Sequence, residues 1–196
     1  MKHLEIEFKT LLSPENYQAL LPRFEGSLLH QQTNYYFDNP QEEMKKKKIA
    51  LRIRRFEDRA ELTLKVPQKS HLAHMEFNQD LSIEEADAIL EGKESLSGFI
   101  AQQVLDRGVD LFSLAPLGAL HTKRYEFEDP NGIWALDQSS YLDQVDYELE
   151  FEVLNEDKGR RVFIDFLDSY QIAYQQAPSK LARFAQRLEQ VNKEKD

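Results

Sequence analysis

Charged and apolar residues alternate one for one in several short stretches of this chain. Residues 146–153 read DYELEFEV, so Glu148, Glu150 and Glu152 alternate with apolar residues. Successive side chains of a β-strand point to opposite faces, so the pattern predicts a strand with one acidic and one apolar face. If the acidic face meets water, the strand is an ordinary half-buried one. If the face points inward, the stacked carboxylates need cations and imply a chemistry.

The same alternation recurs in other predicted strands. Their charged faces carry Glu5, Glu7 and Lys9; Arg52 and Arg54; Glu61 and Lys65; His74 and Glu76; Arg124 and Glu126; and, beside Ala135, Asp137. Helices are expected at 13–24, 82–92, 97–108, 157–170 and 178–194, with Ser13 and Ser82 as N-caps. About eight strands that come in runs, rather than in alternation with helices, favour an antiparallel α+β fold.

Two features favour an inward-pointing charged face over a solvated one. Almost all the polar residues on these faces are ionisable, whereas a solvent-exposed face would also carry many neutral polar residues. The apolar faces also need cover, and the amphipathic helices can supply it from outside. A closed barrel with a charged interior meets both conditions. Its acidic rows would hold divalent metal through oxygen ligands, and its basic rows would hold a polyanion.

Composition limits the remaining possibilities. A chain of 196 residues with 41% hydrophobic residues and no evident boundary is expected to form a single domain over residues 1–196. The net charge of −10 disfavours nucleic acid as a partner, although residues 45–55 read KKKKIALRIRR. The absence of cysteine excludes thiolate catalysis and disulfides. No signal core or membrane span is evident, so a cytoplasmic protein without a membrane partner is expected, as a monomer or a homodimer.

An ordered set of motifs resembles one known family. The motifs are EIEFK, YYFD, LRIR, LTLK, KR, ALD, YELE and PSKLARF, and they run from Leu4 to Phe184. Together they resemble the CYTH superfamily, also called triphosphate tunnel metalloenzymes, and its small bacterial members in particular. The resemblance implies a closed eight-stranded antiparallel β-barrel with flanking helices and a charged tunnel.

The resemblance also implies roles for individual residues. The implied metal ligands, for Mg²⁺ or Mn²⁺, are Glu5, Glu7, Glu76, Asp137, Glu148, Glu150 and Glu152. The implied triphosphate contacts are Lys9, Arg52, Arg54, Lys65, Arg124, Lys180 and Arg183. Within these sets, the residues expected to act in catalysis are Glu5, Glu7, Lys9, Glu148 and Glu150.

The expected activity is metal-dependent hydrolysis of a short triphosphate. Inorganic tripolyphosphate is the first candidate because no base-recognition pocket is evident, and a nucleoside or organic triphosphate such as thiamine triphosphate stays open. Two alternatives remain: an adenylate cyclase that forms cyclic AMP and pyrophosphate, and a non-catalytic polyphosphate- or nucleotide-binding module. The acidic set argues against the module, since a polyanion binder gains nothing from it. The motifs GxxxxGK, GxSxG and HExxH are absent, so the sequence offers no recognised protein nucleophile.

Overall fold

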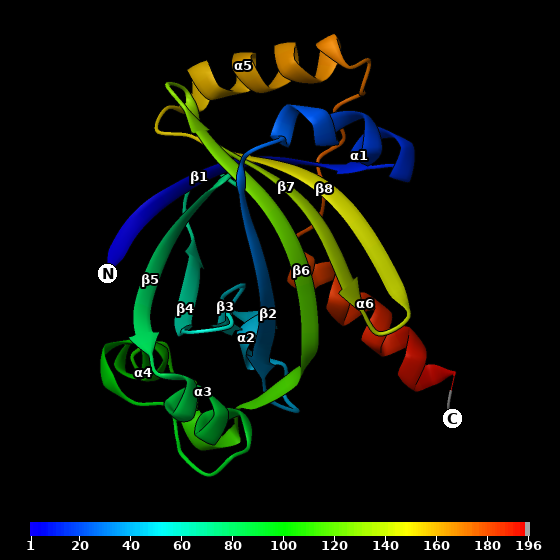
Figure 1. The fold of residues 1–196 in the computed structure, drawn as a ribbon. Helices are drawn as coiled ribbons and strands as arrows, with labels where there is room; N and C mark the ends of the chain where they lie inside the picture. Colours follow the sequence, from blue (N-terminus) through cyan, green and yellow to red (C-terminus); the bar gives the residue numbers. More distant parts are fainter. Residues whose placement is uncertain (195–196) are drawn as a thin grey trace. The chain divides into compact units, whose positions relative to one another are not determined.

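Eight strands form a closed antiparallel barrel in the order β1-β5-β4-β3-β2-β6-β7-β8, which confirms the predicted fold class (Figure 1). The computed structural model describes residues 1–194. The strands are β1 Lys2–Leu12, β2 Leu28–Asp38, β3 Ala50–Arg55, β4 Ala60–Pro67, β5 Ala73–Leu81, β6 Ala115–Asp129, β7 Gly132–Tyr141 and β8 Gln144–Glu152.

Six α-helices and two short 3₁₀ helices are described. The α-helices are α1 Pro14–Leu20, α2 Glu43–Lys46, α3 Ile83–Leu90, α4 Gly98–Leu105, α5 Glu156–Ser169 and α6 Lys180–Lys193, and the 3₁₀ helices are η1 Leu21–Phe24 and η2 Leu111–Ser113. Among residues 1–194, no helix has both the length and the apolar character needed to cross a membrane.

The chain divides into two compact units that interleave along the sequence. The first comprises Met1–Leu4 and Gln32–Ala119, and the second comprises Glu5–Gln31 and Leu120–Asp196. Each unit has its own apolar core and its own group of charged residues. The single-domain organisation of residues 1–196 stays a prediction.

The first unit packs α3 and α4 against the apolar face of β3, β4 and β5. Leu51, Leu62 and Leu64 are fully buried there, together with Ile100 and Val104 of α4. In Figure 1 both helices lie at the end of β5 where that strand finishes. Because helices cover the apolar face, the charged face of these strands is the one turned toward the barrel interior.

The start of α3 follows the predicted capping pattern. The Ser82 side chain accepts a hydrogen bond from the Glu85 backbone N–H, and the Glu85 carboxylate accepts one from the Ser82 N–H. Two otherwise unpaired donors are satisfied in this way, so the chain can turn directly from β5 into the helix that covers it.

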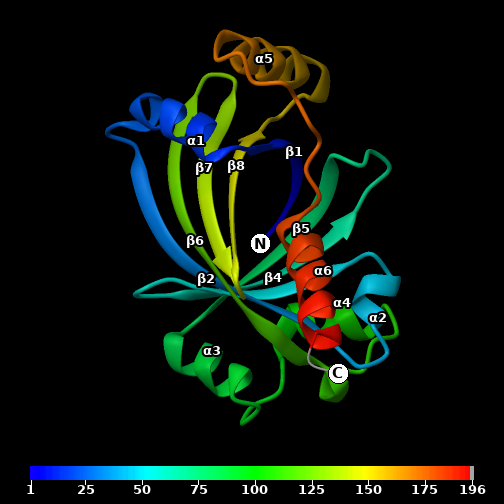
Figure 2. The ribbon, with the colours of Figure 1, turned by 90° about the vertical axis from the view of Figure 1, so that its right-hand side faces the viewer.

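The second unit packs α5 against β1, β7 and β8 through aromatic rings. Trp134 stacks on Phe151 with ring centroids 3.9 Å apart and lies 4.4 Å from Phe166 of α5. Phe8 of β1 stacks on Phe163 of α5 at 5.8 Å. In Figure 2 α5 lies beyond the start of β7 and the end of β8, on the same side as α1. This apolar cover leaves the other face of these strands for the charged residues.

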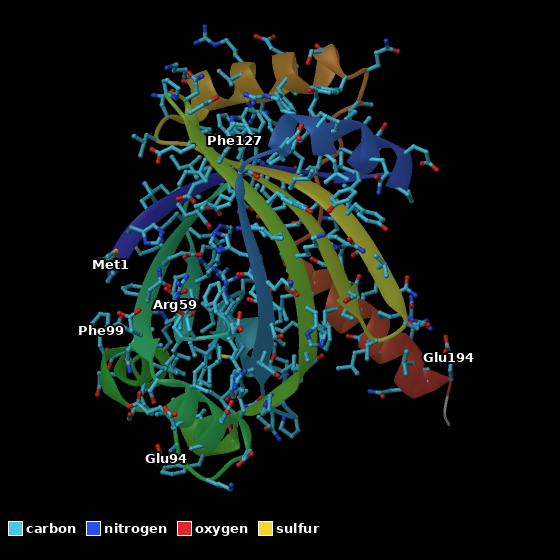
Figure 3. All side chains as sticks on the ribbon, in the orientation of Figure 1. Met1, Arg59, Glu94, Phe99, Phe127 and Glu194 are labelled. Carbon is cyan, nitrogen blue, oxygen red and sulfur yellow. The ribbon has the colours of Figure 1, made fainter. Side chains whose placement is uncertain are left out.

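A second aromatic contact fixes the start of the unit against β6. Phe127, labelled in Figure 3, meets Phe24 of η1 edge to face with centroids 4.9 Å apart, and the Arg23 guanidinium lies 4.5 Å from the Phe127 ring centroid. The helical segment after β1 is therefore held on the apolar face of β6.

The turn between β6 and β7 sets the pairing of those two strands. The Asp129 carboxylate accepts hydrogen bonds from the N–H groups of Asn131 and Gly132, at 2.7 and 3.1 Å. Gly132 has φ 157°, and a Cβ placed there would lie 2.1 Å from the Glu152 carbonyl oxygen. Only glycine allows this close approach of β7 to β8, while the turn itself places Asp129 opposite Gly132 in the pairing of β6 with β7.

Candidate active site

The register of the second unit brings charged residues from several strands onto one face. Across β6, β7 and β8, Arg124 lies opposite Asp137, and Asp137 lies opposite Glu148. Two residues after Glu148 in β8, Glu150 lies opposite Lys9 of β1. Residues that alternate along each strand thus become direct neighbours across the sheet.

Three carboxylates form the centre of this face, which we call the carboxylate cluster. Asp137, Glu148 and Glu150 each place one oxygen within 4.8 Å of the others, and they are 0%, 1% and 6% exposed. Buried oxygen ligands at this spacing suit a hard divalent cation, so the cluster could hold a metal ion.

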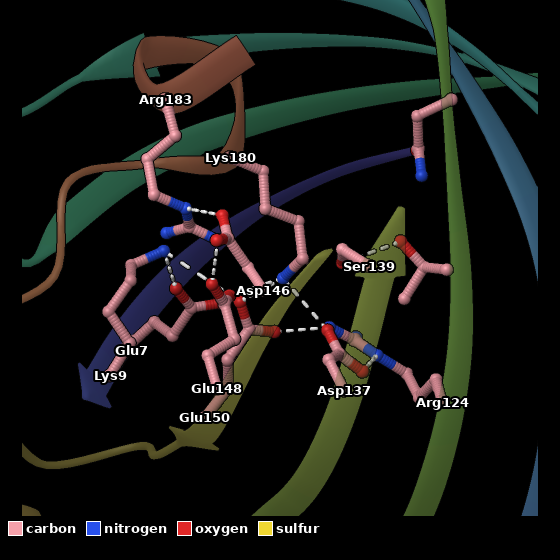
Figure 4. Close-up of polar contacts among 12 residues, drawn as sticks. Glu7, Lys9, Arg124, Asp137, Ser139, Asp146, Glu148, Glu150, Lys180 and Arg183 are labelled. Carbon is pink, nitrogen blue, oxygen red and sulfur yellow. Dashed lines mark hydrogen bonds and ion pairs between the residues drawn. The ribbon is translucent and has the colours of Figure 1, made fainter. Parts of the chain in front are cut away.

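Two cations bridge the carboxylate cluster (Figure 4). Arg124 donates from Nε and Nη2 to the two Asp137 oxygens at 2.8 and 2.7 Å, and Nη2 also contacts Glu150. The Lys180 ammonium lies 2.8 Å from an Asp137 oxygen and 2.7 Å from a Glu150 oxygen, and it also contacts Glu148. Burial of three carboxylates is tolerable because these cations offset their charge.

Arg183, the fourth residue of α6, adds a third cation. Its Nη2 contacts Glu148, its Nε donates to Asp146 at 2.7 Å, and its Nη1 donates to the Pro178 carbonyl at 2.6 Å. Asp146 also accepts a 2.6 Å hydrogen bond from the Tyr141 hydroxyl. Asp146 was not among the predicted site residues, although the alternation that predicted Glu148 places it on the same face of β8.

The remaining predicted residues of this unit lie on β1 and at the end of β8. Lys9 pairs with Glu7 and lies 3.9 Å from a Glu150 oxygen. Glu5 is buried and precedes Glu7 by two residues, and Glu152 is half-buried opposite Glu7. Metal ligation by Glu5, Glu7 and Glu152 stays a prediction, because within residues 1–194 the acidic group whose oxygens lie within 4.8 Å of one another is the carboxylate cluster.

Burial and neighbouring charges make the three carboxylates unequal. Burial raises the pKa of Glu148 to about 7, and the Glu150 charge adds to this while Lys180 opposes it. Burial would also raise the pKa of Glu150, but Lys180 and Arg124 outweigh it and hold that pKa well below its ordinary value. The pKa of Asp137 is likewise lowered against burial by the same two cations. Glu148 is therefore the last of the three to lose its proton.

The first unit carries the predicted basic residues around one carboxylate. Lys65 lies opposite Glu76 and pairs with it, and His3 Nε2 lies 3.7 Å from a Glu76 oxygen. Burial would raise the pKa of Glu76, but Lys65, Arg52 and Arg54 lower it to about 2. Metal ligation by Glu76 stays a prediction. The charged side chains that lower the Glu76 pKa are cations.

Arg54 is positioned by a residue outside the predicted set. Its Nε donates to the Asn34 side-chain oxygen at 3.3 Å, and the two residues lie opposite each other in β2 and β3. Arg52 lies on the same face of β3, opposite Thr63. The first unit thus presents Arg52, Arg54 and Lys65 together on the charged face, as the alternation predicted.

Comparison with known proteins gives the chain a family. The sequence profile of the CYTH domain matches residues 3–185. YjbK of Bacillus subtilis (strain 168), provisionally named a triphosphatase, is 34% identical over 185 residues, which are 93% of this chain and 95% of YjbK.

Solved structures show the same similarity. A crystal structure of a provisionally named adenylate cyclase from Bacillus halodurans has a TM-score of 0.87 and 35% identity, covering 93% of this chain and 98% of that one. A Hippeastrum protein, HpAC1, has a TM-score of 0.81 and 25% identity, covering 95% of this chain and 96% of that one. It is provisionally named an adenylyl cyclase and described as having a dominant triphosphatase activity. The family profile, the relative and the shared barrel agree: this chain belongs to the CYTH domain family.

Proposed function

We propose that this chain is a divalent-metal-dependent triphosphatase. The observation that carries the proposal is the buried carboxylate cluster of Asp137, Glu148 and Glu150, whose charge is offset by the side-chain cations Arg124 and Lys180. The names of YjbK and HpAC1 support triphosphate hydrolysis. A pure polyanion-binding module would be weakened by three buried negative charges, so the cluster argues against it.

Mg²⁺ or Mn²⁺ fits the ligands of the carboxylate cluster. The three side chains offer oxygen only, which suits these hard ions better than zinc. Such an ion, when bound, supplies positive charge to the phosphate oxygens and makes water a stronger nucleophile. Asp137, Glu148 and Glu150 are the residues that would hold it, with Glu5, Glu7, Glu76 and Glu152 as further predicted ligands.

The basic residues would bind the triphosphate. Arg52 and Arg54 can each offer two parallel N–H donors to phosphate oxygens, and Lys65 can offer a compact charge. Lys9, Arg124, Lys180 and Arg183 complete the proposed set in the second unit. Phosphoryl transfer needs positioning and charge neutralisation more than a protein nucleophile, which agrees with a site made only of ionic side chains.

Inorganic tripolyphosphate is the proposed first substrate, and a nucleoside or organic triphosphate is the second. A cyclase is the competing function, because the Bacillus halodurans relative carries that name. A cyclase would use the same cations and carboxylates but would direct the ribose hydroxyl, rather than water, onto the α-phosphate.

The test compares the products formed from tripolyphosphate and from ATP. Orthophosphate, pyrophosphate and cyclic AMP are measured with Mg²⁺, with Mn²⁺ and with EDTA. Metal-dependent orthophosphate release that is fastest with tripolyphosphate is the expected result. Pyrophosphate with cyclic AMP from ATP would establish the cyclase instead, and saturable triphosphate binding without any product would establish the binding module.

A further inference from the structure

The Lys180 ammonium lies where a cation bound to the carboxylate cluster would lie. It contacts all three carboxylates, at 2.8 Å from Asp137 and 2.7 Å from Glu150 and in direct contact with Glu148. Its side chain is 10% exposed. Within the described residues, the ion pairs of Lys180 all go to these three carboxylates, so it acts as their shared counterion.

The local structure of α6 does little to keep Lys180 there. Lys180 is the first residue of the helix, directly after the Ser179 N-cap, and the first turn contains no acidic residue. A positive charge at a helix N-terminus is unfavourable because the helix dipole is positive at that end. The contacts with the carboxylate cluster therefore have to offset this repulsion, and Lys180 loses little else when it leaves.

The other two cations of the cluster are held more firmly. Arg124 lies within the part of β6 that pairs with β7, and it donates two hydrogen bonds to Asp137. Arg183 is tied to Asp146 and to the Pro178 carbonyl as well as to Glu148. Lys180 is thus the cation that can leave without breaking contacts outside the cluster.

Counting charges favours the departure of one cation when a metal ion binds. The three carboxylates and Asp146, which pairs with Arg183, carry up to four negative charges, and Arg124, Lys180 and Arg183 carry three positive charges. A divalent ion added to this group would leave one uncompensated buried positive charge, which is unfavourable. Departure of Lys180 removes that excess charge.

We propose that Lys180 is the resident counterion of the carboxylate cluster and that a divalent ion displaces it. The released ammonium then becomes available to the phosphate chain, so that metal binding prepares a substrate contact. This inference rests on the proposed function in that it takes the carboxylate cluster as the metal site.

The first test measures Mn²⁺ affinity without any phosphate compound. Isothermal titration is carried out on the wild type, on Lys180→Met and on Lys158→Met, in which an exposed lysine of α5 is changed. Removal of a competing partly buried cation should tighten Mn²⁺ binding by about tenfold or more in Lys180→Met. Lys158→Met should bind as the wild type does. Equal or weaker binding by a folded Lys180→Met protein would overturn the proposal.

The second test uses the wild type alone and does not depend on the folding of a variant. An amine-acylating reagent is applied with and without Mn²⁺, and modification of each lysine is followed by mass spectrometry. Displacement from the cluster should increase modification of Lys180 several-fold, while Lys158 should react at the same rate in both conditions. Unchanged or reduced modification of Lys180 at saturating Mn²⁺ would show that the ammonium stays in place.

These tests separate the inference from the proposed function. Neither contains a triphosphate, so a wild type that releases no orthophosphate would overturn the triphosphatase proposal and leave both results interpretable. Conversely, rapid metal-dependent hydrolysis with unchanged Mn²⁺ affinity in Lys180→Met would overturn the displacement and leave the activity intact.

Discussion

Arg124 and Asp137 face each other across β6 and β7 in a two-pronged contact, with Nε–Oδ1 and Nη2–Oδ2 distances of 2.8 and 2.7 Å. Asp137 is fully buried, and Lys180 lies 2.8 Å from the same Oδ2 atom. One carboxylate therefore anchors two cations from elements far apart in the sequence. Its negative charge is a structural requirement as well as part of the proposed site.

We expect Asp137→Asn to lower the free energy of unfolding by about 3 kcal/mol, because it leaves two buried cations with one counter-charge fewer. Urea unfolding followed by tryptophan fluorescence measures the loss. Asp165→Asn, on the exposed surface of α5, is the matched control and should change stability by less than about 0.5 kcal/mol. A loss equal to that of the control would mean that Asp137 is not needed to hold the cations.

Glu148→Gln should separate activity from stability. Its pKa of about 7 means that the carboxyl is already partly protonated near neutral pH, so an amide replaces it at little structural cost. We expect metal-dependent orthophosphate release to fall by about 100-fold or more, while the melting temperature changes by only a few degrees. Glu128→Gln, an exposed change on β6, should retain full activity. Wild-type turnover in Glu148→Gln would remove this residue from the metal site.

Arg52→Ala should weaken substrate binding. Loss of charged hydrogen bonds to phosphate oxygens should raise the Michaelis constant for tripolyphosphate by about tenfold or more. Arg55→Ala is the matched control, because Arg55 lies on the opposite face of β3 and pairs with Asp87 at 3.0 Å. Steady-state kinetics on both variants tests which face of the strand meets the substrate, and equal Michaelis constants would contradict the assignment.

The strand faces could be predicted because they depend on a local rule. Alternation with period two places Glu148 and Glu150 on one face whatever the rest of the chain does. Ser82 is also a local signal, and its role as the N-cap of α3 was predicted and is observed. The closed barrel followed from combining these faces with the need for helical cover.

The composition of each charged group could not be read from alternation alone. Metal ligation by Glu76 stays a prediction, and alternation did not indicate that Lys65 would lie opposite it. That neighbour follows from the pairing of β4 with β5, which is a long-range property. Asp146 was missed although it has the right parity, because its role depends on Arg183 of a distant helix. The short helix α2, which carries the buried Met44, is absent from the helices expected from the sequence.

Glu76→Gln should destabilise the first unit in a pH-dependent way. The cations around Glu76 lower its pKa to about 2 from 4.5, so the ionised form stabilises the fold by roughly 3 kcal/mol at pH 7. Because the folded-state pKa is the lower one, this contribution is complete above pH 4.5 and is lost as the pH falls toward 2. Urea unfolding should therefore show a gap between wild type and Glu76→Gln that is largest at pH 7 and shrinks below pH 4.5. Asp80→Asn, an exposed change on the same strand, should show no such gap, and a Glu76→Gln gap that is constant with pH would contradict the ionic role of Glu76.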